Sequence, residues 1–248
     1  MKNLQDRVAV ITGAANGIGL DLAVRFLKEG MDVVIADKDA DDLAHAKETL
    51  RPLGNVIAVE TDVSDRESVQ RLADASVDRF GAVHVLCNNT GIGGFQRLAT
   101  ASLATWDWTV RVNLLGMLNG CQIFLPILAL QEEGYIVNTA SISGFVAGAY
   151  LEPYGVSKAC VVSLSESLAA EFAIEYPHIG VAVLCPAQAD ICTDEIAQFV
   201  IDAMATRKTH IFPHSQLASA MAAKRLHRHG ADLPAGDGWP WIRIDSSQ

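Results

Sequence analysis

Short, almost continuous apolar runs recur through the first 185 residues, and they constrain the fold more than any other feature of the chain. They are rich in Val, Ile, Leu and Ala and contain few charged residues. Strands that helices bury on both faces of a parallel sheet have this composition. The predicted strands are Val8–Thr12, Asp32–Asp37, Asn55–Thr61, Val83–Asn88, Tyr135–Ala140 and Val181–Cys185.

Segments with helical periodicity separate these runs. Gly30 follows the first segment, at the position after a helix end that favours glycine. The predicted helices are Gly17–Glu29, Ala40–Leu50, Arg66–Phe80, Leu103–Leu130 and Pro153–Tyr176. Strands that alternate with helices in this way predict an α/β fold, with one doubly wound parallel sheet flanked by helices on both faces.

The alternation weakens toward the carboxyl end. Asp194–Thr206 and Ser215–His229 have helical patterns, and His210–Phe212 is a candidate for a last short strand. The segment 230–248 is rich in Gly, Pro and Asp, which predicts an irregular tail. Because no repeat or linker interrupts the chain, we expect a single domain over residues 1–248.

Composition narrows the class of protein. Half of the residues are hydrophobic and 19% are charged, which allows a large core. The net charge of -10 disfavours nucleic acid and anionic membranes as partners. The five cysteines include no C-x-x-C pair and lie among apolar residues, which indicates buried free thiols. Such thiols suit a reducing compartment, and no signal peptide is visible, so we expect a cytoplasmic protein.

Three other features have ordinary structural interpretations. Leu114–Leu130 is strongly apolar, but polar residues and Pro126 interrupt it, so we interpret it as a buried or subunit-interface helix. No carboxylate or cysteine completes a ligand set with His210 and His214, so we expect no metal site. The tryptophans at positions 106 and 108 are interpreted as packing residues.

A glycine-rich turn follows the first predicted strand. Residues Thr12–Gly19 contain glycines spaced as G-x-x-x-G-x-G and lead directly into a helix. Such a turn lets the backbone approach a pyrophosphate, to which the helix N-terminus offers free N–H groups. Asp37 ends the second predicted strand, 18 residues after Gly19, where an acid binds the hydroxyls of an adenosine ribose. Together these features predict a dinucleotide site.

At this point the sequence resembles the short-chain dehydrogenase/reductase family over about residues 5 to 190. Thr12–Gly19 matches its T-G-x-x-x-G-I-G motif, Asp62-Val63 its adenine-binding pair, and Asn88–Gly91 its N-N-A-G, with Thr90 in place of alanine. The resemblance implies a Rossmann-type fold and an NAD cofactor. The cofactor-binding residues that it implies are Gly13, Asn16, Gly17, Ile18, Gly19, Asp37, Asp62, Val63, Asn89, Tyr154, Lys158, Pro186 and Ala189.

Tyr154 and Lys158 form the family's Y-x-x-x-K motif, and their spacing has a physical reason. Residues four apart share one helix face, so the ammonium lies near the phenol. A neighbouring cation stabilises phenolate and lowers the phenol's pKa from its usual value of about 10. By itself the pair is also compatible with an ordinary helix surface. The resemblance adds Ser141 and Asn113, and so implies a catalytic set of Asn113, Ser141, Tyr154 and Lys158.

The chain departs from the family pattern after the sixth predicted strand. The usual P-G-x-V-x-T is replaced by a segment in which Ala187 and Ile191 stand at the glycine and threonine positions. The usual substrate lid is either absent or missing from this sequence. In relatives, the segments that carry Ser143 and Gln188 border the substrate, so we expect substrate contacts from Ser141, Ser143, Tyr154 and Gln188.

These observations predict an NAD-dependent oxidoreductase that transfers hydride between the nicotinamide and a fairly apolar secondary alcohol or ketone. Residues 1–140 would mainly hold the cofactor, and residues 141–248 would form the catalytic and substrate half. A dinucleotide-binding regulator without turnover is the alternative; a hydratase or epimerase is a third. Asp37 favours NAD over NADP, although Lys38 could partly offset its charge. The apolar helices predict a homodimer or homotetramer that acts on a small molecule.

Overall fold

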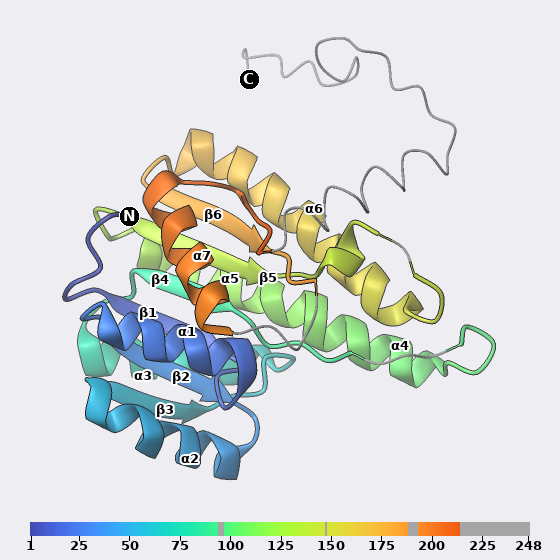
Figure 1. Cartoon of the computed structure of the whole chain (residues 1–248), viewed down its shortest axis with the longest axis horizontal. Helices are drawn as coiled ribbons and strands as arrows, with labels where there is room; N and C mark the ends of the chain where they lie inside the picture. The colour runs from blue at the N-terminus through green and yellow to red at the C-terminus, as the bar shows by residue number, and fades with distance from the viewer. Residues whose placement is uncertain (94–96, 147, 188–192, 214–248) are drawn as a thin grey trace.

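The computed structural model describes all residues except 94–96, 147, 188–192 and 214–248. Its centre is a sheet of seven strands in the order β3-β2-β1-β4-β5-β6-β7, all paired in parallel (Figure 1). The strands are β1 Val8–Thr12, β2 Asp32–Asp37, β3 Val56–Glu60, β4 Val85–Asn88, β5 Gly134–Thr139, β6 Ile179–Leu184 and β7 His210–Ile211. The order reverses between β1 and β4, and a ligand crevice opens at the carboxyl ends of strands beside such a reversal.

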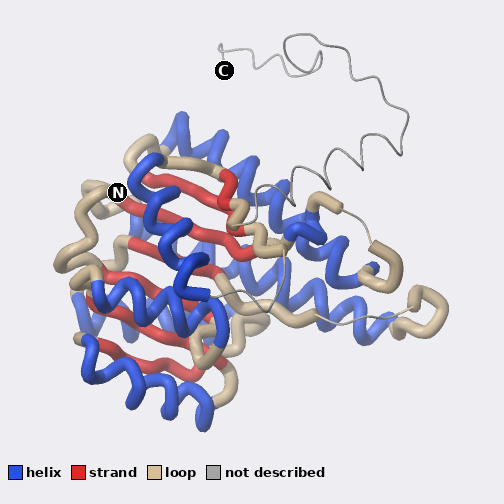
Figure 2. Tube along the Cα trace, in the orientation of Figure 1, coloured by secondary structure: helices blue, strands red, loops and turns tan. Residues whose placement is uncertain are grey.

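Helices cover both faces of this sheet (Figure 2). The α-helices are α1 Gly17–Lys28, α2 Ala40–Leu50, α3 Arg66–Phe80, α4 Leu103–Val110, α5 Gly116–Leu128, α6 Glu152–Glu175 and α7 Thr193–Thr206. The predicted α/β fold and its doubly wound parallel sheet are therefore confirmed. The boundaries of β1, β2, α2 and α3 agree with the predicted ones, and those of the other elements differ by at most two residues at either end.

Alternation along the strands explains why the apolar runs are continuous. On β1, Ala9 and Ile11 face a core that includes α1, α2 and α7, whereas Val10 faces one that includes α3, α5 and α6. All three side chains are fully buried. Successive strand residues point to opposite faces, so a strand covered on both faces needs an apolar residue at every position.

The predicted helix Leu103–Leu130 is observed as one uninterrupted helical run over Leu103–Leu128, but not all of it is α-helical. A π-helical turn at Arg111–Leu115 separates α4 from α5, and α5 ends at Leu128. Leu103–Leu128 as a whole is long and apolar enough to cross a membrane, as core helices of water-soluble proteins also are, and 44% of its most apolar window is buried inside the protein. Single-turn π-helices within α-helices often occur at functional sites.

The cysteine prediction is correct in part. Cys87, Cys121 and Cys185 are buried free thiols, but Cys160 is an exposed one on α6. Cys160 lies on the outward side of this helix, where apolar neighbours in sequence do not bring burial. Cys192, the predicted helix 215–229 and the tail 230–248 lie outside the described residues.

Candidate active site

The turn between β1 and α1 has a backbone that requires glycine at two positions. Gly13 has φ +64° and Gly17 φ +55°, both in the left-handed region. A Cβ on Gly13 would also lie 2.8 Å from the Cα of Thr90. Asn16 precedes α1 without a side-chain cap, and no acid stands in the first turn. The first N–H groups of α1 are therefore left for a ligand, and this open cradle fits a pyrophosphate.

Hydrogen bonds tie this turn to the ends of β4 and β5. The Thr12 hydroxyl oxygen accepts the N–H groups of Asn89 at 3.0 Å and Thr90 at 3.2 Å. The Asn89 amide donates to the Gly13 carbonyl at 3.1 Å and accepts from the Thr139 hydroxyl at 3.1 Å. Both ends of the Asn89 side chain are thus engaged within the protein, and they hold the turn in place.

Asp37 lies at the end of β2 beside the glycine turn. Its carboxylate accepts the N–H groups of Ala15 at 3.4 Å, Lys38 at 2.8 Å and Asp39 at 3.4 Å. The side chain is half-buried, so its position is set by these bonds while part of it stays open to a ligand. An adenosine ribose that followed a pyrophosphate at α1 would meet this carboxylate.

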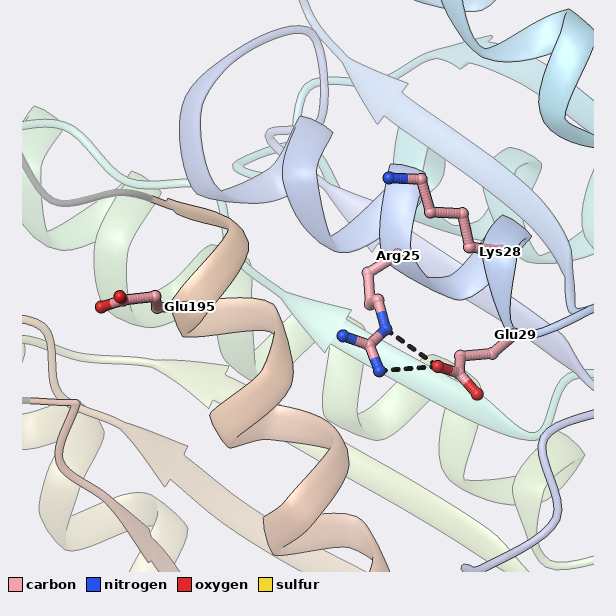
Figure 3. A pocket seen from close by; sticks show the side chains of 4 residues that line it. All are labelled: Arg25, Lys28, Glu29 and Glu195. Carbon is pink, nitrogen blue, oxygen red and sulfur yellow. Dashed lines mark hydrogen bonds and ion pairs between the residues drawn. The ribbon is translucent and has the colours of Figure 1, made fainter.

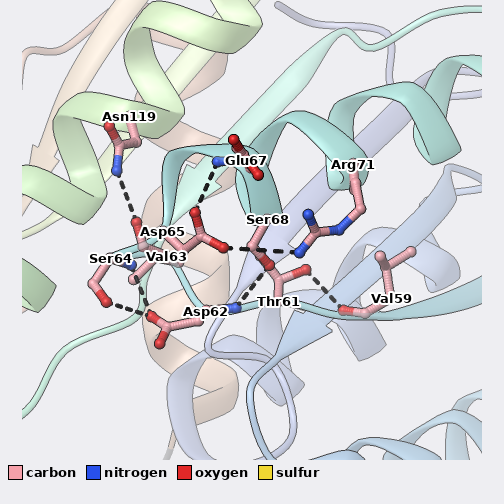
Figure 4. A network of polar contacts seen from close by, with 10 residues as sticks. All are labelled: Val59, Thr61, Asp62, Val63, Ser64, Asp65, Glu67, Ser68, Arg71 and Asn119. Atoms are coloured by element: carbon pink, nitrogen blue, oxygen red, sulfur yellow. Dashed lines mark hydrogen bonds and ion pairs between the residues drawn. The ribbon is translucent and has the colours of Figure 1, made fainter.

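Asp62 and Val63 form a rigid corner after β3 (Figure 4). Asp62 Oδ1 accepts the Ser64 N–H at 2.9 Å and the Ser64 hydroxyl at 2.7 Å. The Val63 carbonyl accepts the amide of Asn119, on α5, at 3.0 Å. The corner is thereby fixed between α3 and α5, at the same end of the sheet as Asp37.

Asn113 stands in the π-helical turn and is fully buried. Its Oδ1 accepts the Ile92 N–H at 2.8 Å, and its Nδ2 donates to the Ile92 carbonyl at 2.8 Å. Nδ2 also donates to the Ser157 hydroxyl at 2.9 Å, which in turn donates to the Tyr154 carbonyl at 2.7 Å. Ser157 therefore joins the π-helical turn to α6. The sequence analysis missed it, although a polar residue on an apolar helix face was a usable signal.

Lys158 is buried with its ammonium held at the end of β5. Nζ donates to the Thr139 carbonyl at 2.8 Å and lies 5.8 Å from the centre of the Tyr154 ring. Burial lowers the pKa of Lys158 to about 8, with a smaller opposing effect from Cys185. A Cβ on Gly91 would lie 3.0 Å from Nζ and 3.5 Å from Asn113 Oδ1. Lys158 and Asn113 therefore converge beside this glycine.

Tyr154 and Ser141 border the same cluster. The Tyr154 ring packs closely against Gly93, where a Cβ would lie 3.1 Å from Cδ2. Ser141 is 7% exposed and caps the 3₁₀ helix Ile142–Gly144 by accepting the Ser143 N–H at 3.1 Å. A Cβ on Gly144 would lie 2.7 Å from the Lys158 carbonyl, so this short helix packs directly on α6. The four residues predicted to be catalytic thus come from α6, the segment after β5 and the π-helical turn.

The segment after β6 is described only at its start. The Pro186 carbonyl accepts the Ile142 N–H at 2.9 Å, which ties it to the Ser141 segment. Gln188 and Ala189, predicted as substrate and cofactor contacts, lie outside the described residues. No group of metal-ligating side chains occurs in the part of the chain that the structure describes.

A separate surface pocket of about 400 Å³ is lined by residues of α1 and α7 (Figure 3). Its lining consists of Arg25, Lys28, Glu29 and Glu195. Arg25 donates to Glu29 Oε1 at 2.9 and 2.7 Å, which neutralises one charge of each sign. The pocket contains none of the residues around the glycine turn or around Lys158 and Tyr154, so it is not the candidate active site.

The family model for short chain dehydrogenases matches residues 7–198. The chain is a short-chain dehydrogenase/reductase. It is 33% identical over 235 residues to 1-deoxy-11-beta-hydroxypentalenate dehydrogenase of Streptomyces exfoliatus, covering 86% of this chain and 85% of the relative. It is 38% identical over 175 residues to 2-(R)-hydroxypropyl-CoM dehydrogenase of Xanthobacter autotrophicus, covering 67% and 69%.

Solved structures agree with this assignment. A short-chain dehydrogenase/reductase from Burkholderia phymatum in complex with NAD has a TM-score of 0.87 and 31% identity, covering 96% of this chain and 100% of that one. A short-chain dehydrogenase from Novosphingobium aromaticivorans has a TM-score of 0.89 and 35% identity, covering 97% and 91%. Short-chain dehydrogenases/reductases are oxidoreductases that bind a nicotinamide dinucleotide and act on small molecules, and the glycine cradle of this one fits such a cofactor.

Proposed function

We propose that this short-chain dehydrogenase/reductase is an NAD-dependent enzyme that interconverts a fairly apolar secondary alcohol and its ketone, with Tyr154 as acid/base. The observation that carries the proposal is the convergence of Tyr154, Lys158 and Asn113 around Gly91 and Gly93. This cluster lies at the carboxyl end of the sheet, to which the glycine turn is also tied.

The cofactor would lie across this end of the sheet. The N–H groups from Gly17 to Gly19 would bind its pyrophosphate, Asp37 its adenosine ribose, and Asp62 with Val63 would border its adenine. Lys158, Tyr154 and Pro186 would border its other half. Bound nicotinamide supplies the hydride acceptor for an alcohol, or the hydride donor for a ketone.

The proton transfer is the part that the protein itself performs. In the oxidising direction, the Tyr154 oxygen takes the proton of the substrate hydroxyl while the carbon loses hydride. The buried ammonium of Lys158, beside the Tyr154 ring, would offset negative charge that develops on the phenol oxygen during this transfer. The hydroxyl of Ser141 would hold the substrate oxygen beside Tyr154. Asn113 acts as the anchor of Ser157 and of the turn that faces Lys158.

An apolar substrate suits the segment after Ser141. The rings of Phe145 and Phe212 meet edge to face with 5.2 Å between their centres, and both are half-buried. Ser143 is the polar neighbour that could orient a substrate there. The His210 ring also borders both phenylalanines, at 6.1 and 6.0 Å between ring centres. Sites for hydrophobic small molecules are typically lined by aromatic side chains with a few polar groups of this kind.

Replacing Tyr154 with Phe tests the assignment. Turnover of a responsive alcohol with NAD should fall by at least about 100-fold, the lower end of the usual contribution of acid/base groups, while the Kd for NAD stays within about threefold. Tyr150→Phe is the matched control, because Tyr150 is another tyrosine of the same region and is 50% exposed. An intact rate in Tyr154→Phe would refute the role of Tyr154. Binding of NAD without turnover across a broad alcohol and ketone panel would favour the regulator instead.

We also propose that the protein acts in the cytoplasm as a homodimer or homotetramer. Free thiols at all four described cysteines support a reducing compartment. Exposed apolar side chains on the helices at residues 103–128 and 152–175, including Leu103, Leu115 and Val156, support a subunit interface. Within one subunit, residues 1–140 would mainly hold the cofactor, and residues 141–248 would provide Tyr154 and the substrate site.

A further inference from the structure

Lys38 makes a long-range contact that bears on cofactor choice. Its Nζ lies over the ring of Trp108, 5.3 Å from the ring centre. Lys38 follows Asp37 after β2, whereas Trp108 lies on α4, 70 residues further along the chain. An ammonium at this distance is attracted to the electron-rich face of an indole. Trp108 is 39% exposed, so its ring is available for this contact and is not simply a core residue.

The helical run that carries Trp108 also borders the proposed adenosine site. Eight residues after Trp108, a Cβ on Gly116 would lie 2.7 Å from Val63 Cγ2. Further along, Asn119 donates to the Val63 carbonyl. The Asp62–Val63 corner therefore packs directly against the helical run that follows Trp108. The Lys38 side chain reaches across toward the helix.

The other charges around Lys38 are acidic. Asp37 precedes it, and Asp39 follows it and caps α2 by accepting the Asp42 N–H at 3.0 Å. Among the described residues, Lys38 nevertheless forms no ion pair with either neighbour. Its ammonium is directed to Trp108 instead, which leaves the charge of Asp37 uncompensated by Lys38 at the ribose.

We propose that Trp108 is a positioning residue for cofactor specificity: it holds the Lys38 ammonium on its indole face, away from the place where NADP carries its 2′-phosphate. The inference rests on the proposed NAD preference and explains how a lysine next to Asp37 leaves that preference intact. To bind NADP with the help of Lys38, the protein must first break the Lys38–Trp108 contact. The free energy needed to break this contact weakens the binding of NADP but not the binding of NAD.

Trp108→Leu removes the indole face and keeps an apolar side chain. Breaking an exposed cation–π contact changes an equilibrium by about two- to fivefold. We therefore expect the ratio of Kd for NADP to Kd for NAD to fall by about that factor in Trp108→Leu. Titration of the whole protein with each dinucleotide, without a substrate, measures this ratio. Trp108→Phe, which keeps an aromatic face, should change it less.

A double-mutant cycle with Lys38→Gln separates this role from a structural one. If Trp108 acts through Lys38, the Trp108→Leu change should have no effect on the ratio once residue 38 is Gln. Trp106→Leu, which alters the neighbouring tryptophan of α4, should leave the ratio unchanged. An unchanged ratio in Trp108→Leu, or an equal change with and without Lys38, would overturn the inference. A wild-type protein that binds NADP as tightly as NAD would instead refute the proposed NAD preference, whatever the cycle shows.

Discussion

Replacement of Lys158 by Met should make the protein more stable at neutral pH while it abolishes turnover. Burial lowers the pKa of Lys158 from 10.5 to about 8, so the charged form is disfavoured in the folded protein. At about 1.4 kcal/mol per pH unit, this difference corresponds to a cost of about 3 kcal/mol at pH 7. Met removes that cost but also removes the bond from the ammonium to the Thr139 carbonyl, which contributes about 1.5–3 kcal/mol for a charged donor. The expected net gain in unfolding free energy is therefore at most about 1.5 kcal/mol.

The gain should depend on pH in a defined direction. The pKa of Lys158 is lower in the folded than in the unfolded protein, so the unfolded chain binds more protons between about pH 8 and pH 10.5. Wild-type stability therefore receives a favourable contribution as pH rises through this window. The Lys158→Met variant has no such group. The charge-burial cost that Met removes is full below pH 8 and is gone near pH 10.5, where only the loss of the Thr139 bond remains and the variant is the less stable protein.

Urea unfolding of the cofactor-free proteins, followed by circular dichroism at pH 7 and pH 10, measures both effects. Lys28→Met is the control, because Lys28 is an exposed lysine on α1 and its replacement should change stability by less than about 0.5 kcal/mol at either pH. A Lys158→Met variant less stable than wild type at pH 7 would refute the argument. An equal stability difference between variant and wild type at pH 7 and pH 10 would also refute the argument, because a cost that arises from burial of the charge must fall as Lys158 loses its proton.

Three further predictions concern other parts of the molecule. The wild type should prefer NAD over NADP by at least about tenfold in kcat/KM, and Asp37→Ala should narrow this preference. The Asp37 carboxylate repels the 2′-phosphate of NADP by about 2 kcal/mol after screening, and the variant loses that repulsion. Equal use of NADP by the wild type would contradict this prediction. His84 accepts the Val8 N–H at 3.1 Å, and burial, with Arg7, lowers its pKa. Its contribution to stability is therefore complete above pH 6.5 and lost as pH falls through the lowered pKa. The urea midpoint of unfolding should be lower at pH 5.5 than at pH 7.5, and this decrease should be smaller in His84→Gln. Light scattering at micromolar concentration should give at least a dimer, because Leu115 and Val156 are 43% and 48% exposed; a monomeric mass would refute this.

The fold was predictable because its signals are local and repeated. Each strand buried on two faces must be apolar at every position, so β1 and β2 could be located to the residue from their composition. The glycine turn was predictable for a related reason, since the left-handed conformations of Gly13 and Gly17 restrict which residues can stand there. Motif order then added Asn113, Ser141, Tyr154 and Lys158 as candidates, and in the structure Lys158 lies near both Tyr154 and the glycine beside Asn113.

Features that depend on contacts between distant segments were not predictable in this way. The pattern at Leu103–Leu130 indicated one continuous helix, but the bonds of Asn113 to Ile92 and Ser157 accompany a π-helical turn within it. Cys160 has apolar neighbours in sequence and is nonetheless exposed, because burial depends on which helix face meets the sheet. Trp108 was interpreted as a packing residue, whereas its ring lies under the Lys38 ammonium.

The sequence by itself therefore determined the α/β class, the order of its elements and the candidate residues, because periodicity and backbone conformation are properties of neighbouring residues. Tertiary structure alone decided how those residues are supported. The depth at which Lys158 is buried lowers its pKa, and the bond from Asn113 to Ser157 joins two helices. Both effects arise from solvent exclusion and from contacts across the fold, which no local pattern encodes.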